Sequence, residues 1–194
     1  MNNIKIGICG WGNVATGLYE ALGNNADIIK LNSGAEFSIE VIGARRDNPK
    51  CDPGETKIVR DIFEVIHHDI DVVVELIGGV EVARNLILEA IKNKKHVITA
   101  NKAVIFHHGD EIFQLAREYE VKVLFESAVC AGTPIIKLLQ EELAANRVSK
   151  ISGMLNGTSN FILSNMEEGG EFDSTLALAQ KEGYAEPDPA FDIE

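Results

Sequence analysis

Short apolar runs alternate with helix-like segments along most of the chain. The runs that predict strands are residues 4–9, 39–44, 72–76, 96–99 and 121–125. Between them, residues 14–22, 62–66, 82–93 and 110–119 predict helices; in residues 82–93, Leu86, Ala90 and Ile91 recur at helical spacing. Strands that alternate with helices predict an α/β fold, in which helices cover both faces of a parallel sheet. The run 72–76 is nearly all apolar, which is typical of a central strand buried on both faces.

The residue composition of the chain changes after Phe125. Residues 126–134 are mostly small and end at Pro134, which suits the first turn of a helix over 135–143. A strand over 151–155 and a helix over 174–182 are expected next. Residues 156–160 are small and polar, so they either bind polar groups of a substrate or cap a helix over 161–166. The change predicts a hinge near residues 126–134 and a second, short domain.

A glycine motif joins the first expected strand to the first expected helix. Gly10, Gly12 and Ala15 form a G-x-G-x-x-A pattern in this setting, which is typical of dinucleotide-binding folds. The first glycine permits a tight turn, the second lets the backbone approach a pyrophosphate, and the small third residue lets the helix pack closely on the strand. The helix N-terminus at Asn13 and Val14 then offers N–H groups to the phosphates. The alternative is a glycine turn without a ligand.

Two arginines stand where the second strand ends. In NAD-binding folds an acidic residue at this position takes the ribose hydroxyls, whereas guanidinium groups suit the 2′-phosphate of NADP. Arg45 and Arg46 therefore favour NADP, with NAD still possible. In the alternative interpretation one or both arginines are solvated loop charges and Asp47 takes a ribose hydroxyl.

Composition excludes several classes of function. The chain has 194 residues and a net charge of −12, which argues against binding to nucleic acid or to an anionic membrane surface. Its three cysteines form no C-x-x-C pair and suit a reducing compartment. The N-terminus lacks the pattern of a signal peptide, and no apolar run approaches the length of a membrane span. We expect a cytoplasmic protein that binds neither nucleic acid nor a membrane, and the charge says little about a small-molecule substrate.

Six segments, taken together and in order, resemble homoserine dehydrogenase. They are residues 10–17, 75–79, 99–102, 126–136, 156–163 and 182–189. The resemblance implies an enzyme that reduces L-aspartate 4-semialdehyde to L-homoserine with NAD(P)H, in threonine, methionine and isoleucine biosynthesis. It also implies a homodimer for the full-length form. The expected organisation is a Rossmann-type doubly wound domain over residues 1–130, followed by an incomplete α+β substrate and dimerisation domain over residues 131–194.

The resemblance also assigns residues to a cofactor and a substrate site. Beyond the glycine loop and the arginines, the implied cofactor contacts are Ile77, Gly78, Ala100, Lys102 and Gly183. Lys102 follows the fourth expected strand at the edge where ligands bind in such folds, so a role in catalysis is also implied. Glu186 and Asp192 would line the homoserine site, where a carboxylate suits the amino group of the substrate.

A monovalent cation site is implied in the loop of small residues. Carried over by position, its ligands would be the side chain of Glu126 and the carbonyls of Val129, Ala131 and Thr133 around a sodium-type ion. Oxygen ligands of this kind suit hard cations. The family usually has an aliphatic residue at Thr133 and often a glycine at Cys130, changes that carbonyl ligands tolerate.

The family motif continues past Glu194 with a glycine, an aspartate and the lysine that is presumed to protonate the substrate. We therefore expect the 194-residue chain to bind cofactor but to turn over poorly. Two alternatives stay open. One is another amino-acid or semialdehyde oxidoreductase of this architecture, and the other is a non-catalytic dinucleotide-binding module.

Overall fold

The computed structural model of the protein describes residues 2–154 and 156–185. Its elements in chain order are β1 (Asn2–Cys9), α1 (Asn13–Asn24), α2 (Ala26–Ser33), β2 (Ala35–Gly43), β3 (Lys57–Val59), η1 (Glu64–His67), β4 (Val72–Glu75), α3 (Glu81–Lys92), β5 (His96–Thr99), α4 (Lys102–Glu118), β6 (Val123–Leu124), η2 (Glu126–Ala128), α5 (Ile135–Lys137), η3 (Leu138–Glu142), α6 (Gly157–Glu167) and α7 (Phe172–Glu182). The chain divides into two compact units, residues 1–136 and 137–194.

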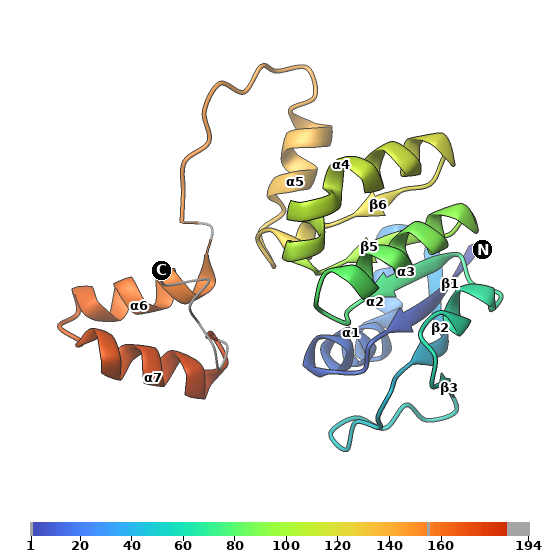
Figure 1. Ribbon diagram of the computed structural model, residues 1–194, viewed down its shortest axis with the longest axis horizontal. Helices are drawn as coiled ribbons and strands as arrows, with labels where there is room; N and C mark the ends of the chain where they lie inside the picture. Colours follow the sequence, from blue (N-terminus) through green and yellow to red (C-terminus); the bar gives the residue numbers. More distant parts are fainter. Residues whose placement is uncertain (1, 155, 186–194) are drawn as a thin grey trace. The chain divides into compact units, whose positions relative to one another are not determined.

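The first unit is built on a six-stranded parallel sheet with the strand order β3-β2-β1-β4-β5-β6 (Figure 1). This is the order of the Rossmann fold, in which the chain starts at the centre, winds to one edge, and returns to wind to the other. The expected Rossmann-type doubly wound fold of the first domain is therefore confirmed. The order reverses between β1 and β4, and Cys9 pairs there with Glu75 at the carboxyl ends of both strands.

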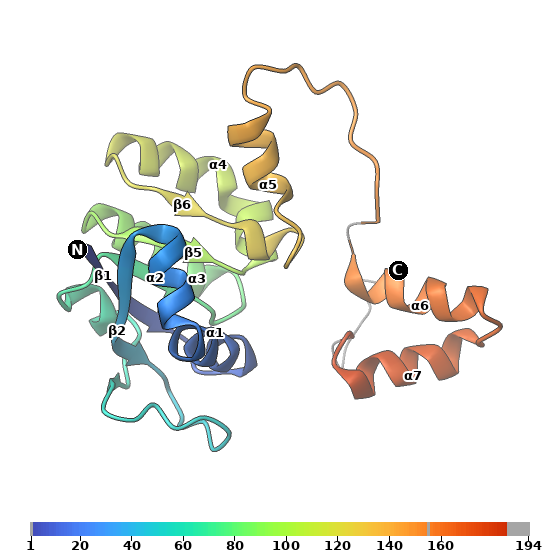
Figure 2. The ribbon, with the colours of Figure 1, turned by 180° about the vertical axis from the view of Figure 1, so that it is seen from behind.

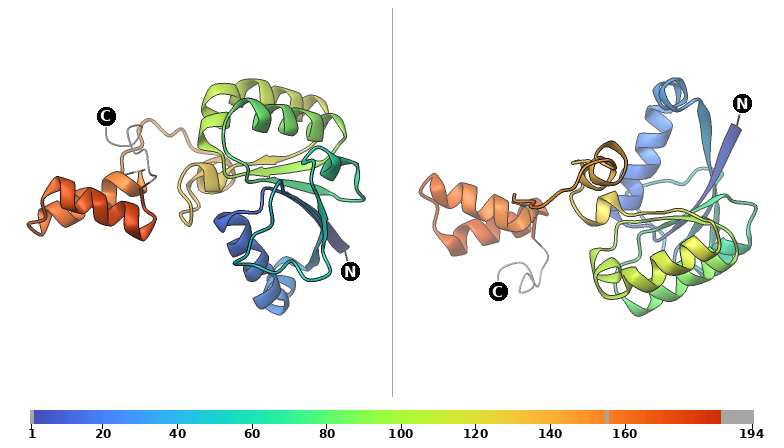
Figure 3. Two further views of the ribbon diagram at one scale, coloured as in Figure 1. Left: turned by 60° about the horizontal axis from the view of Figure 1, so that its bottom comes forward. Right: turned by 90° about the horizontal axis from the view of Figure 1, so that it is seen from above.

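Helices cover both faces of this sheet. Figure 2 shows α1 and α2 on one face, and the right-hand view of Figure 3 shows α3 and α4 on the opposite face. Successive strand residues point to opposite faces, so β4 sends Val73 toward α3 and α4 and Val74 toward α1. Each buried aliphatic side chain contributes about 1.5–3 kcal/mol. The largest contributions under α3 come from Leu86, Ile87 and Ile91, none of which is exposed.

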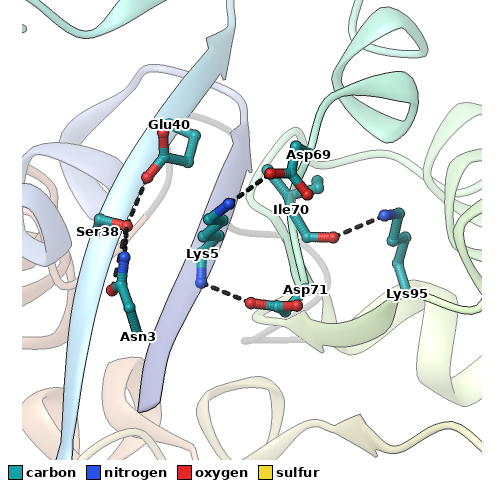
Figure 4. Close-up of polar contacts among 8 residues, drawn as sticks. All are labelled: Asn3, Lys5, Ser38, Glu40, Asp69, Ile70, Asp71 and Lys95. Carbon is teal, nitrogen blue, oxygen red and sulfur yellow. Dashed lines mark hydrogen bonds and ion pairs between the residues drawn. The ribbon is translucent and has the colours of Figure 1, made fainter. Parts of the chain in front are cut away.

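Polar contacts hold the amino-terminal edge of the sheet together (Figure 4). The backbone N–H of Lys5 on β1 donates to Asp71 Oδ2 at 2.8 Å, and the Lys5 ammonium pairs with Asp69. This pairing raises the pKa of Lys5 and lowers that of Asp69. Lys95 Nζ donates to the carbonyl of Ile70 at 2.6 Å, which ties the start of β5 to the same turn. The network fixes the edge opposite to the one that carries the glycine loop.

Three elements of the first unit differ from the sequence expectation. α2 lies between the helix expected over residues 14–22 and the strand expected over residues 39–44, where we expected no element, and β3 is a three-residue edge strand too short to show a pattern. α4 begins at Lys102 instead of residue 110, because Asn101 Oδ1 accepts from the N–H of Val104 and caps the helix there.

The described part of the second unit consists of helices joined by irregular segments. α6 and α7 pack through Ile162 and Ala179, and the rings of Phe161 and Tyr184 stack with centroids 4.6 Å apart. The strand expected over residues 151–155 is wrong for residues 151–154, which are irregular, and residue 155 lies outside the described residues. A strand needs a neighbour for its hydrogen bonds, and no strand lies among the described residues of this unit. Across residues 2–154 and 156–185, no helix is both long and apolar enough to span a membrane.

Candidate functional site

The glycine loop connects β1 directly to α1. Gly10 has φ +104°, and a Cβ there would lie 2.5 Å from the carbonyl oxygen of Leu76, so only glycine fits. Gly12 is the N-cap of α1, and a Cβ there would meet no atom of the described residues within 4 Å. Because this N-cap has no side chain, the first N–H groups of α1, at Asn13 and Val14, stay open to an incoming anion. Ala15 is fully buried, as close packing on the strand requires.

A groove of about 820 Å³ lies at the carboxyl ends of the central strands. Its lining comes from the glycine loop, the ends of β2 and β3, and the turn after β4: Gly10, Trp11, Gly12, Gly43, Ala44, Arg45, Arg46, Arg60, Asp61, Ile62, Phe63, Leu76, Ile77, Gly78 and Val82. Ligands of open α/β sheets bind at this position, where the strand order reverses. The groove, the open N-terminus of α1 and the space at Gly12 together fit a dinucleotide.

Arginines form the wall of the groove on the β2 side. Arg45 and Arg46 follow β2 and are exposed, so both guanidinium groups can reach an anion in the groove. Arg60 follows β3 and stands beside them, with Nη1 3.3 Å from the carbonyl oxygen of Ala44. Arg60 was not expected at this site, because β3 has no sequence pattern that would place its end next to that of β2.

A buried polar network joins the two turns on the other side of the groove. Glu75 is fully buried, and its carboxylate accepts from the Thr99 hydroxyl at 2.5 Å and from the N–H of Ile77 at 2.9 Å. The Thr99 hydroxyl accepts in turn from the N–H of Asn101, whose side chain donates to the carbonyl of Gly79 at 2.6 Å. The turn that carries Ile77 and Gly78 is thereby fixed to the turn that carries Ala100 and Lys102.

Burial also sets the chemistry of a thiol next to this network. Cys9 is inaccessible, and burial, with a smaller contribution from the Glu75 carboxylate, raises the pKa of its thiol to about 12. A neutral thiol is a poor nucleophile. Cys9 is therefore a packing residue.

Lys102 is the first residue of α4 and is exposed at the carboxyl edge of the sheet. Ala100 lies between this helix and β5, and its N–H approaches the carbonyl of Glu75 at 3.4 Å. Both residues stand at the edge that carries the groove, although neither belongs to its lining.

The loop of residues 126–134 supplies several oxygen atoms. Glu126 Oε1 accepts from the N–H of Ile136 at 2.8 Å, and the carbonyl of Thr133 accepts from the N–H of Ile135. In the described part of the chain, no backbone N–H outside the helices donates to the carbonyls of Val129 and Ala131. The donor set of one carboxylate and backbone carbonyls fits a hard cation.

The remaining expected site residues belong to the second unit. Gly183 ends α7 with φ +83°, which gives it a structural reason to be glycine. Asn156 Oδ1 accepts from the N–H of Ser159 at 2.8 Å, so the capping alternative for residues 156–160 is realised at this residue. Glu186 and Asp192 lie outside the described residues.

Comparison with known proteins gives matches along the whole chain. A family profile described as "Homoserine dehydrogenase, NAD binding domain" matches residues 10–126, and one described as "Homoserine dehydrogenase" matches residues 134–194. A homoserine dehydrogenase of Pseudomonas aeruginosa is 53% identical over 100% of this chain and 45% of its own length.

Solved structures agree with these matches. The structure of a homoserine dehydrogenase from Thiobacillus denitrificans superimposes with a TM-score of 0.91 at 46% identity, covering 100% of this chain and 46% of the other. A hyperthermophilic archaeal homoserine dehydrogenase in complex with NADPH gives a TM-score of 0.80 at 27% identity, covering 98% of this chain and 65% of the other. The chain thus spans a little under half the length of the Pseudomonas and Thiobacillus proteins.

Proposed function

The chain belongs to the homoserine dehydrogenase family, and on that basis we propose that it binds a nicotinamide dinucleotide for the reduction of L-aspartate 4-semialdehyde to L-homoserine. The observation that carries the proposal is the groove at the reversal of the strand order, with the glycine loop and the open N-terminus of α1 at its side. This step belongs to threonine, methionine and isoleucine biosynthesis, which makes the cytoplasm the expected location.

In this proposal each part of the first domain, residues 1–130, binds one part of the cofactor. The N–H groups of Asn13 and Val14 bind the pyrophosphate between Gly10 and Gly12. Arg45 and Arg46 favour NADP over NAD because a planar guanidinium binds a phosphate through two parallel hydrogen bonds. The turns at Ile77–Gly78 and Ala100 support the nicotinamide half, and Gly183, in the second domain (residues 131–194), is the further cofactor contact that the resemblance implies.

The bound nicotinamide supplies the hydride that the aldehyde carbon receives. Lys102 holds a positive charge at the carboxyl edge of the sheet, where the aldehyde oxygen gains negative charge during this transfer. Glu186 and Asp192 orient the amino group of the substrate. Glu126 and the carbonyls of Val129, Ala131 and Thr133 would hold a sodium-type cation, which would order the loop of residues 126–134. The full-length form is a homodimer.

The experiment that tests the reaction is a spectrophotometric assay of NADPH oxidation by the purified full-length form, with the 194-residue chain, which we expect to turn over poorly, assayed beside it. L-aspartate 4-semialdehyde should support oxidation, and succinate semialdehyde, which has the same chain length but lacks the amino group, should support it far less. Equal rates with both substrates would favour a different semialdehyde oxidoreductase. Binding of dinucleotide without any turnover would favour the non-catalytic dinucleotide-binding module.

A further inference from the structure

The ends of β2 and β3 bring one carboxylate into the group of arginines. Gly43 pairs with Val59 across the two strands, and the N–H of Ala44 donates to the carbonyl of Val59 at 2.9 Å. Arg60, the next residue after β3, therefore faces the segment that follows β2. Its Nη2 donates to Asp47 Oδ1 at 2.7 Å, while its side chain also lines the groove next to Arg46.

This ion pair is exposed to solvent and therefore weak. The side chains of Arg60 and Asp47 are 57% and 76% exposed, and one oxygen of the carboxylate makes the contact. Exposed pairs of this kind are among the weakest interactions in proteins, because water and salt screen both charges. A phosphate offers up to two negative charges and three oxygens to the same guanidinium, in a geometry that allows two hydrogen bonds. A phosphate is therefore a stronger ligand for this guanidinium than a single carboxylate oxygen.

We propose that Asp47 is a specificity-determining residue, an internal anion that occupies Arg60 in the free protein and yields it to the 2′-phosphate of the dinucleotide. The inference rests on the proposed function and refines it. Arg60 becomes a phosphate ligand beside Arg45 and Arg46. The Asp47 carboxylate lowers affinity for the phosphorylated cofactor alone, because it competes for Arg60 and repels the phosphate. The dinucleotide without this phosphate leaves the pair intact.

The test compares the affinities of NADP⁺ and NAD⁺ in four proteins: the unmodified chain, D47N, R60Q and the double variant. Binding is followed by calorimetry and by the fluorescence of Trp11, the single tryptophan, which lies in the groove wall. D47N should raise the affinity for NADP⁺ about three- to tenfold and change the affinity for NAD⁺ by less than about twofold. R60Q should lower affinity for NADP⁺ about tenfold. In the R60Q background, D47N should lose most of its effect.

E36Q is the matched control. It removes one negative charge from another exposed ion pair, Lys30–Glu36, at the opposite end of β2. It should change neither affinity by more than about twofold. The inference is overturned if D47N changes the affinities for NADP⁺ and NAD⁺ equally, or if it leaves the affinity for NADP⁺ unchanged. It is also overturned if D47N raises the affinity for NADP⁺ as much in the R60Q background as in the unmodified chain. If the unmodified chain binds neither dinucleotide, the proposed function itself fails.

Discussion

The carboxylate of Glu75 at the end of β4 accepts a hydrogen bond from the hydroxyl of Thr99 at the end of β5, and neither side chain is exposed. A buried carboxylate is tolerated only when hydrogen bonds replace its hydration. This contact therefore makes the carboxyl edge of two central strands one rigid support for the turns beside the groove.

Thr99→Val tests this support. Valine keeps the shape of threonine but leaves one oxygen of the Glu75 carboxylate without its donor, so the free energy of unfolding should fall by about 1–3 kcal/mol. Urea denaturation followed by Trp11 fluorescence measures the loss in the first unit. Thr133→Val is the control, because this threonine is exposed and should change stability by less than about 0.5 kcal/mol. Equal stability of the two variants would contradict a stabilising role for the contact.

The two glycines of the loop should respond differently to alanine. In Gly10→Ala the new Cβ meets the Leu76 carbonyl at 2.5 Å, and the positive φ adds strain, so we expect a loss of about 2 kcal/mol or more. In Gly12→Ala the Cβ has room in the protein, so the loss should stay below about 1 kcal/mol.

Dinucleotide affinity should fall in Gly12→Ala nonetheless, because the methyl group occupies space that the pyrophosphate needs. Urea denaturation and calorimetry on the same two variants separate the effects. If Gly12→Ala binds dinucleotide as tightly as the unmodified chain, the pyrophosphate does not lie on this loop.

Cys9 predicts a loss of stability in alkali. Its folded pKa of about 12 lies above the ordinary value of 9.0, so the unfolded thiol ionises first as the pH rises. The stabilising effect is fully present below pH 9 and is lost as the pH rises toward 12. Between these two pH values, the free energy of unfolding should fall by up to about 1.4 kcal/mol per pH unit because of this thiol. Cys9→Ala should remove this slope, since every other titrating group is shared. If the free energy of unfolding falls equally with pH in Cys9→Ala and in the unmodified protein, the raised pKa is contradicted.

The arginines after β2 predict a selective effect on cofactor choice. Arg45→Gln and Arg46→Gln should each lower affinity for NADPH about tenfold, because each removes a charged hydrogen bond to the 2′-phosphate. Affinity for NADH should change by less than about twofold. Lys50→Gln is the control, since this lysine lies in the same connection, is exposed and does not line the groove. A parallel loss for NADH in both arginine variants would assign them to a different part of the cofactor.

The central strands could be predicted because each carries its apolar pattern within its own few residues. β4 and the second half of β1 are buried, so they appear as nearly continuous apolar runs, and β5 is short but has Val97 and Ile98 at its centre. The glycine pattern marked the turn to α1. Helix boundaries depended on single side chains. The Asn101 cap starts α4 eight residues before the predicted residue 110, and exposed Phe106 obscured the amphipathic pattern in that stretch.

The parts of the site that escaped prediction depend on distant pairing. Arg60 reaches the groove only because β3 pairs with β2, and a three-residue edge strand has no periodicity to reveal this. The contact of Glu75 with Thr99 joins residues 24 positions apart, and nothing in either segment alone indicates it. Carbonyl ligands such as those proposed at Val129 and Ala131 leave no trace in residue type, so the family resemblance was their only signal.

The most direct test of the account is calorimetric titration of the chain with NADPH and, separately, with NADH. We predict saturable binding of NADPH at a single site, tighter than that of NADH, and its loss in Gly12→Ala. Absence of binding by either dinucleotide, or binding of NADH as tight as that of NADPH, would contradict the account.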